Sequence, residues 1–323
     1  MAAITAGMVA QLREKTGAGM MQCKQALTEA DGDLDEAVKI LRVKSAGKVG
    51  ARAERTAAEG LVMATVSPSK TVGVLVEMNS ETDFVARNED FKTLARTIAQ
   101  SLASYEPGTV PSSTEEFLQD TLAGGATVAD TITEAAARIG EKIALGRWER
   151  FGAPDGNAVQ AYVHNPSGSG DEGGKIGVMV EVTGGADAAA LSTLAREIAL
   201  HISSANPLYL TDDEVDAATL GQEREVALAQ LQADPKMAGK PQQVLDNVVT
   251  GRVRKFLEEK VLLNQPYVRE PGKTVGQLVK ETSGASVVRF VRFRVGEEGG
   301  RVAGANDTQG ARRATGVANA ASS

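Results

Sequence analysis

The run Thr71-Val72-Gly73-Val74-Leu75-Val76-Glu77 returns later in the chain as Lys175-Ile176-Gly177-Val178-Met179-Val180-Glu181. Both runs are short, apolar and rich in β-branched residues, which is typical of a buried strand. Each is followed by a similar helical segment, Thr93-Leu94-Ala95-Arg96 after the first and Thr193-Leu194-Ala195-Arg196 after the second. The sequence therefore contains a tandem duplication.

Each copy of the duplication is predicted to fold in the order β-β-α…α-β. In the first copy the apolar residues alternate across a hairpin at 62–76, and a helix at 91–102 carries one apolar stripe. A second helix begins near Thr127 and leads to a strand at 143–151. The second copy repeats these elements, but its last helix and strand come only after Thr274.

The segment inserted into the second copy is predicted to be a helical hairpin that projects from the body. Thr211-Asp212-Asp213-Glu214 is a capping signal for its first helix, and the proline-containing stretch 234–241 marks its turn. Apolar residues recur at helical spacing on both sides of that turn. The insertion therefore adds two helices to the duplicated core.

The two ends of the chain differ from the core. Residues 4–41 are predicted to form three short helices with glycine-containing turns, a compact bundle of the ubiquitin-associated type, followed by a basic connector at 44–55. Residues 299–323 contain no aromatic, Leu or Ile residue, so that end is predicted to be disordered.

The fold class is therefore α+β. The predicted units are a helical bundle at 1–55, a first core subdomain at 56–151, a second core subdomain at 152–210 and 264–295, a helical hairpin at 211–263, and a disordered tail at 296–323.

The composition excludes several classes of protein. The 323 residues are 42% hydrophobic, which supports folded domains, and the net charge of −7 argues against non-specific nucleic-acid binding. One cysteine allows no intramolecular disulfide and fits a reducing compartment. The start of the chain lacks a signal-peptide pattern, and no apolar run reaches the roughly 18 residues of a membrane span. A cytoplasmic location without membrane contact is expected.

The sequence offers little enzyme chemistry. Gly173-Gly174-Lys175 is followed by Ile rather than Ser or Thr, so it is no phosphate-binding loop. His164, His201 and Cys23 do not make a metal-ligand set. Cys23 lies on the apolar face of its predicted helix, which favours packing over nucleophilic catalysis. We expect no catalytic residues, no metal, no cofactor and no enzymatic activity.

One connection distinguishes the first copy from the second. Between strand and helix the first copy has Asn79-Ser80-Glu81-Thr82-Asp83-Phe84-Val85-Ala86-Arg87-Asn88-Glu89-Asp90, whereas the second has a segment four residues shorter, Thr183 to Ala190. An aromatic residue among charges is unusual in such a surface connection. Phe84 either folds back onto its own sheet or contacts another protein. The second reading is favoured because the other copy lacks the segment.

Three groups of residues resemble the bacterial elongation factor Ts family. They are Thr82 to Ala86; Leu12 to Met21 with Cys23 to Leu27; and Gly251 to Phe256 with Gln265 to Tyr267 and Thr274 to Leu278. They occur in family order and span residues 1–295. The resemblance implies a guanine-nucleotide exchange factor of translation elongation with a coiled-coil arm at 211–263. The tail does not resemble the C-terminal helix with which some members touch their partner.

The resemblance also implies the partner and the residues that contact it. The partner is elongation factor Tu, in its GDP-bound and nucleotide-free forms, with higher assemblies of the two factors allowed. The Asp83–Phe84 pair would act as a wedge on the magnesium and phosphate region of the Tu G domain. The other residues implied to contact Tu are Thr82, Val85, Arg13, Met20, Met21, His164 and Ile139.

Two of these assignments are weighed on the residues themselves. Met20 and Met21 are adjacent and cannot both face one helix stripe. Either one is in the core and the other is exposed, or they belong to an adaptable contact surface. Ile139 lies in a run that resembles the family's Ile-Gly-Glu-Asn but has Lys142 in place of Asn.

The strongest alternative function is that of a scaffold or adaptor, in which the bundle and the arm only hold partners together. An enzyme is a more distant alternative. Release of a fluorescent GDP analogue from Tu, measured with and without this chain, distinguishes an exchange factor from an adaptor.

Overall fold

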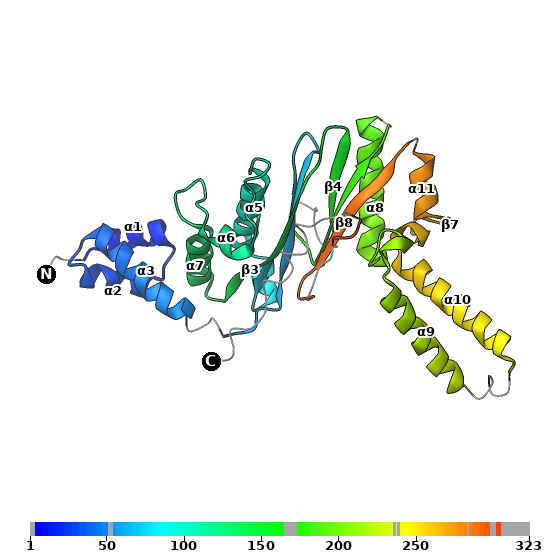
Figure 1. Cartoon of the computed structure of the whole chain (residues 1–323). Coiled ribbons are helices and arrows are strands. Elements are labelled where there is room, and N and C mark those ends of the chain that lie inside the picture. Colours follow the sequence, from blue (N-terminus) through cyan, green and yellow to red (C-terminus); the bar gives the residue numbers. More distant parts are fainter. Residues whose placement is uncertain are drawn as a thin grey trace.

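The structure of the chain, a computed structural model, describes residues 4–50, 54–164, 173–185, 187–234, 237, 240–282, 284–297 and 302–304, with side chains omitted at 42 and 45–50. Figure 1 shows a helical bundle at the N-terminal end, a core with two sheets in the middle, and a helical arm that projects from the far side. The division of the chain into units made from the sequence stays a prediction.

The bundle consists of α1 (Ala6–Thr16), α2 (Met20–Glu29) and α3 (Leu34–Gly50). Leu12, Cys23 and Leu27 are buried at its centre, so the expected packing role of Cys23 is confirmed. The helix α3 continues to Gly50, into the segment that the sequence suggested was a connector. That boundary was wrong because Gly47 weakens a helix by only about 1 kcal/mol and does not end it. The ubiquitin-associated type of the bundle stays a prediction.

The first repeat is a three-stranded antiparallel sheet covered by helices on one face. Its strands are β1 (Glu59–Val66), β2 (Val72–Ser80) and β3 (Ile143–Gly152), and its helices are α4 (Asp83–Ala86), α5 (Glu89–Ala103), α6 (Thr114–Gln119) and α7 (Val128–Ile139). The hairpin, the helix over 91–102 and the last helix and strand are confirmed. The short α6 was not predicted.

The second repeat has the same architecture. Its strands are β4 (Asn157–His164), β5 (Ile176–Thr183) and β8 (Ser286–Arg294), and its helices are α8 (Ala188–Ala205) and α11 (Val275–Glu281). The sheet order β4-β5-β8 repeats the order β1-β2-β3, so the predicted duplication is confirmed. A small sheet of β6 (Pro266–Tyr267) and β7 (Glu270–Thr274) was not predicted.

The two sheets pack face to face, and the helices cover their outer faces (Figure 1). The contacts across this interface are reciprocal. The Arg147 guanidinium of the first repeat lies 4.6 Å from the ring centre of Phe293 in the second. In return, the Arg289 guanidinium of the second repeat lies 4.2 Å from the ring centre of Phe151 in the first. The repeats are therefore related by an approximate twofold axis, as in an isologous dimer.

The glycine shared by the two repeated strands explains how closely the sheets approach. A Cβ added to Gly73 would lie 2.5 Å from Val159, and one added to Gly177 would lie 2.4 Å from Val62. Both distances are too short for a side chain. Each repeat therefore uses a glycine to admit a valine of the other, which fixes the core that supports the surface loops.

The arm consists of α9 (Ala217–Gln232) and α10 (Gln242–Lys260), which pack on each other and project from the second repeat (Figure 1). Its first helix begins later than predicted. Thr211 precedes only a 3₁₀ turn, since the Glu214 carboxylate accepts a hydrogen bond from the Leu210 N–H at 2.9 Å, and Asp216 caps α9 instead. A helical hairpin is confirmed, and its coiled-coil character stays a prediction.

The predicted start of the disordered tail, at residue 296, is too early. The backbone of Ala303 pairs with that of Phe290 at the edge of β8, and Ala303 is buried. The Gly296 N–H donates to the Glu77 carboxylate at 3.0 Å. These residues are held by the core. Disorder over 305–323 concerns residues outside the described ones and stays a prediction.

Candidate functional site: a partner-binding surface

Phe84 is the most exposed large apolar side chain among the described residues, with 77% of its surface accessible. It lies on α4, the single helical turn that follows β2. The fold-back onto its own sheet, which the sequence left open, is therefore not seen. A ring held in water in this way costs free energy unless a partner buries it.

The neighbours of Phe84 have different environments. Val85 is only 7% exposed and packs into the core of the first repeat, so its side chain is directed inward. The Asp83 carboxylate is part-exposed and forms an ion pair with Arg87 at 2.8 Å, one helical turn later. Val85 therefore anchors the turn, while Asp83 and Phe84 lie at its surface.

The residues before Phe84 are fixed by a turn of the chain some 60 residues later. The Thr82 N–H and hydroxyl both donate to the Glu141 carboxylate, at 3.0 and 2.7 Å. The Lys142 N–H donates to the Glu81 carboxylate at 2.6 Å. These hydrogen bonds thus join the loop that precedes Phe84 to the turn between α7 and β3. The role of Glu141 was missed from the sequence, although the run around it had been singled out.

A second exposed surface lies on the bundle. Met20 and Met21 are 61% and 67% exposed, so neither is in the core, and the alternative that placed one of them there is not seen. Both stand in the first turn of α2, before that helix packs on its neighbours through Cys23 and Ala26. Adjacent exposed methionines form an adaptable apolar contact surface.

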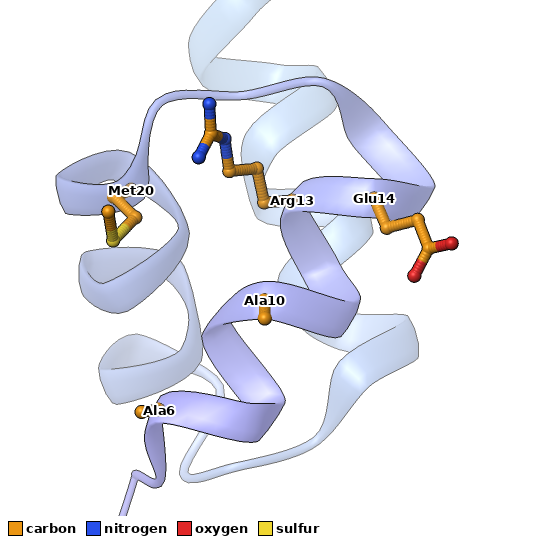
Figure 2. Close-up of a pocket in the computed structure, with 5 residues that line it drawn as sticks. All are labelled: Ala6, Ala10, Arg13, Glu14 and Met20. Atoms are coloured by element: carbon orange, nitrogen blue, oxygen red, sulfur yellow. The ribbon is translucent and has the colours of Figure 1, made fainter.

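A shallow pocket of about 380 Å³ adjoins Met20. Figure 2 shows how its lining residues come from α1 and the start of α2, with Arg13 beside the loop that joins them. The pocket is lined by Ala6, Ala10, Arg13, Glu14 and Met20. Small side chains on one helix and a guanidinium at the rim suit an apolar group with an adjacent negative charge. The structure thus places Arg13 and Met20 beside the same pocket.

The bundle contacts the first repeat through α7. The helix α3 packs near α7, and a Cβ added to Gly17 would lie 2.6 Å from the Arg138 side chain. Arg138 also forms an ion pair with Asp90 at 3.3 Å, at the start of α5. The bundle surface and the Phe84 loop are therefore carried by elements that touch each other.

The other two predicted residues lie on different repeats. His164 is exposed at the end of β4, where its Nδ1 is 3.2 Å from the Tyr162 hydroxyl. Ile139 is half-buried against the core of the first repeat at the end of α7. Among the residues that the structure describes, no cluster of three His, Cys, Asp or Glu side chains could hold a metal ion. In the same part of the chain, no helix has the length and apolarity to cross a membrane.

Comparisons with known proteins identify the family of this chain. The family model described as "Elongation factor TS" matches residues 81–297. Elongation factor Ts of Methylococcus capsulatus is 44% identical over 294 residues, covering 91% of this chain and 92% of that protein. The proteins of the same name from Alkalilimnicola ehrlichii and Clostridium perfringens are each 40% identical, over 91% of this chain and 93% of their own lengths. The chain belongs to the elongation factor Ts family.

Proposed function

We propose that this chain is a cytoplasmic guanine-nucleotide exchange factor that promotes release of GDP from elongation factor Tu during translation elongation. Membership of the family supports this proposal, and so does the exposed Phe84 on a loop fixed to a packed core. The chain would act by binding, with no catalytic chemistry, cofactor or metal of its own.

The physical basis of exchange is linkage. A protein that binds nucleotide-free Tu more tightly than GDP-bound Tu must weaken GDP binding by the same factor. Nanomolar nucleotide binding corresponds to about 12 kcal/mol. Only interactions that differ between the two states of Tu contribute, and a contact at the nucleotide site would supply such a difference directly.

The Asp83–Phe84 pair is the element we assign to that contact. Inserted beside the magnesium and phosphates, Phe84 would displace the groups that hold them, and burial of its exposed ring would favour the complex. Val85 would serve as the anchor of the turn rather than as a direct contact, because it is packed in the core.

The remaining contacts would hold the wedge in place. Arg13, Met20 and Met21 would bind the G domain with the bundle, and Ile139 would add its exposed edge. His164, on the second repeat, would bind a different domain of Tu. An interface with two such parts lets binding energy gained far from the nucleotide be used to strain its site.

The test is the release of a fluorescent GDP analogue from purified Tu with and without this chain. Strong acceleration is expected. An adaptor would bind Tu and leave the release rate unchanged. Chemical turnover of a substrate in the absence of Tu would instead indicate an enzyme.

A further inference from the structure

We propose that Glu141 is a positioning residue for Phe84. Together with Glu81, it would hold the loop in the conformation needed for nucleotide exchange, so the proposal rests on the function proposed above. Neither carboxylate needs to touch Tu for this role. Glu141 accepts from the Thr82 backbone just before the wedge, and Glu81 accepts from the Lys142 backbone in the turn that carries Glu141.

The observation that carries the proposal is a reciprocal pair of backbone bonds. Glu141 accepts the N–H of Thr82, and Glu81 accepts the N–H of Lys142. Thr82 directly follows Glu81, and Lys142 directly follows Glu141. Each bond therefore joins the residue after one glutamate to the carboxylate of the other glutamate, which fixes the two segments against each other. The Thr82 hydroxyl adds a third bond, at 2.7 Å to Glu141. Hydrogen bonds to a charged acceptor are among the stronger ones in proteins.

The turn that carries Glu141 is well suited to hold the loop. Gly140 ends α7 in the left-handed conformation, with φ of 93°, and β3 begins at Ile143, so Glu141 lies between two packed elements. The Ser80 hydroxyl donates to the Thr82 carbonyl at 2.9 Å and fixes the same residue from the strand side. Thr82 is therefore held immediately before the helical turn of Phe84.

The Glu81 carboxylate and the Lys142 side chain also contact Arg55, at the end of the connector. Arg55 forms an ion pair with Glu81 at 3.1 Å, and the Lys142 ammonium donates to the Arg55 carbonyl at 2.8 Å. The connector, the Phe84 loop and the turn after α7 thus meet at one junction.

A fixed loop matters because nucleotide exchange would depend on the position of the Phe84 ring in the complex with Tu. A loop that must be ordered on binding loses part of the binding free energy to conformational entropy. A chain with a loosened loop would still bind Tu through the bundle and the second repeat. It would insert Phe84 less often, so maximal GDP release would fall more than affinity.

The experiment compares Glu141→Ala with wild type in the full chain by two measurements. Hydrogen exchange of the free chain reports the loop, and the amides of residues 82–87 are expected to exchange at least about tenfold faster, since about 1.4 kcal/mol is lost. GDP release from Tu at saturating chain is expected to slow about tenfold, with a smaller change in the concentration for half-maximal effect. Glu141→Gln, which can accept from the Thr82 N–H and donate to its hydroxyl, should restore most of both.

Glu116→Ala is the matched control. Glu116 accepts the N–H and the hydroxyl of Ser112, both at 2.7 Å, so its removal breaks an equivalent pair of bonds at a different loop. It should leave the Phe84 loop and GDP release as in wild type. If Glu141→Ala is poorly folded, Glu141→Asp repeats the test, because it keeps the charge and withdraws the carboxylate by one methylene.

Two results would overturn the proposal. One is unchanged hydrogen exchange of the loop in Glu141→Ala, and the other is a loosened loop with wild-type GDP release. Phe84→Ala, measured alongside, separates this failure from that of the proposed function. If Phe84→Ala slows release and Glu141→Ala does not, only the positioning role is lost. If neither slows release, the wedge is lost and the positioning role with it.

Discussion

Phe84 and Val85 are neighbours on the same helical turn, yet Phe84 is 77% exposed and Val85 only 7%. Burial of Val85 in the core of the first repeat fixes the turn. The bonds from Thr82 to Glu141 fix the chain just before it. The aromatic ring is therefore presented to solvent by a segment that is held at two points, which is how a rigid contact residue differs from a mobile surface side chain.

The paired methionines of the bundle should contribute to Tu binding without supporting the fold. Replacing Met20 and Met21 with serine is expected to weaken binding about tenfold, because two apolar side chains at an interface would lose their burial. The melting temperature should change little, since both are already exposed in the free chain. Calorimetric titration of Tu measures the effect.

Val43→Ser is the matched control for the methionine pair, because Val43 is an equally exposed apolar residue of α3, at 73%. Its affinity for Tu should equal that of wild type. If the Met20/Met21 variant bound Tu with wild-type affinity, these two residues would not belong to the proposed interface.

Stability should fall in mild acid because of His201. Its Nε2 lies 2.8 Å from the Gln265 side-chain oxygen, and its Nδ1 accepts the Val268 N–H, so the ring is held neutral between two partners. Burial lowers the pKa of His201 below its usual value, against a smaller opposing effect of the Gln265 hydrogen bond. The Glu197 carboxylate nearby is bound by Tyr267 and Arg269.

The sign of this effect follows from the lowered pKa. Above pH 6.5 the ring is neutral in both states and carries no proton-linked penalty. As the pH falls below 6.5, the unfolded chain takes up a proton that the folded chain does not, so stability decreases down to the folded pKa. Urea unfolding at several pH values measures this slope. It should be shallower in His201→Gln, and an unchanged slope in that variant would contradict the assignment.

The start of the tail should stabilise the core. Truncation after Val295 removes the pairing of Ala303 with Phe290 and the bond from Gly296 to Glu77. We expect the melting temperature to fall by a few degrees, since each kcal/mol is worth roughly 1.5 °C at about 2.1 cal/mol/K per residue over 323 residues. Truncation after Gly304 should have little effect. Equal melting temperatures of the two truncations, by differential scanning calorimetry, would show that residues 296–304 contribute nothing.

The sequence predicted the repeated core well because its signals are local. The apolar runs of the two hairpins and the apolar stripe of each long helix depend only on spacing, and the strands and helices form where expected. Thr5 and Thr274 cap their helices through side-chain hydrogen bonds, as threonine at a helix N-cap position commonly does. The exposed Phe84 followed from comparing the two copies.

The features that the sequence missed depend on contacts between distant segments. Glu141 and Thr82 are 59 positions apart, and nothing in either local pattern links them. Ala303 is buried only because an edge of β8 is available to pair with it. The short α6 is stabilised by Phe117, which packs against Tyr105 and Trp148 from other elements. A capping serine and a glutamate three residues later did mark its start.

The most direct test of the exchange mechanism is the rate of GDP release from Tu at saturating concentrations of wild-type chain and of Phe84→Ala. Loss of a buried interface aromatic costs at least about 2 kcal/mol, so release should slow by about 30-fold or more. The melting temperature should stay close to that of wild type, because the ring is exposed in the free chain. Release at the wild-type rate by a folded, Tu-bound Phe84→Ala chain would contradict the wedge.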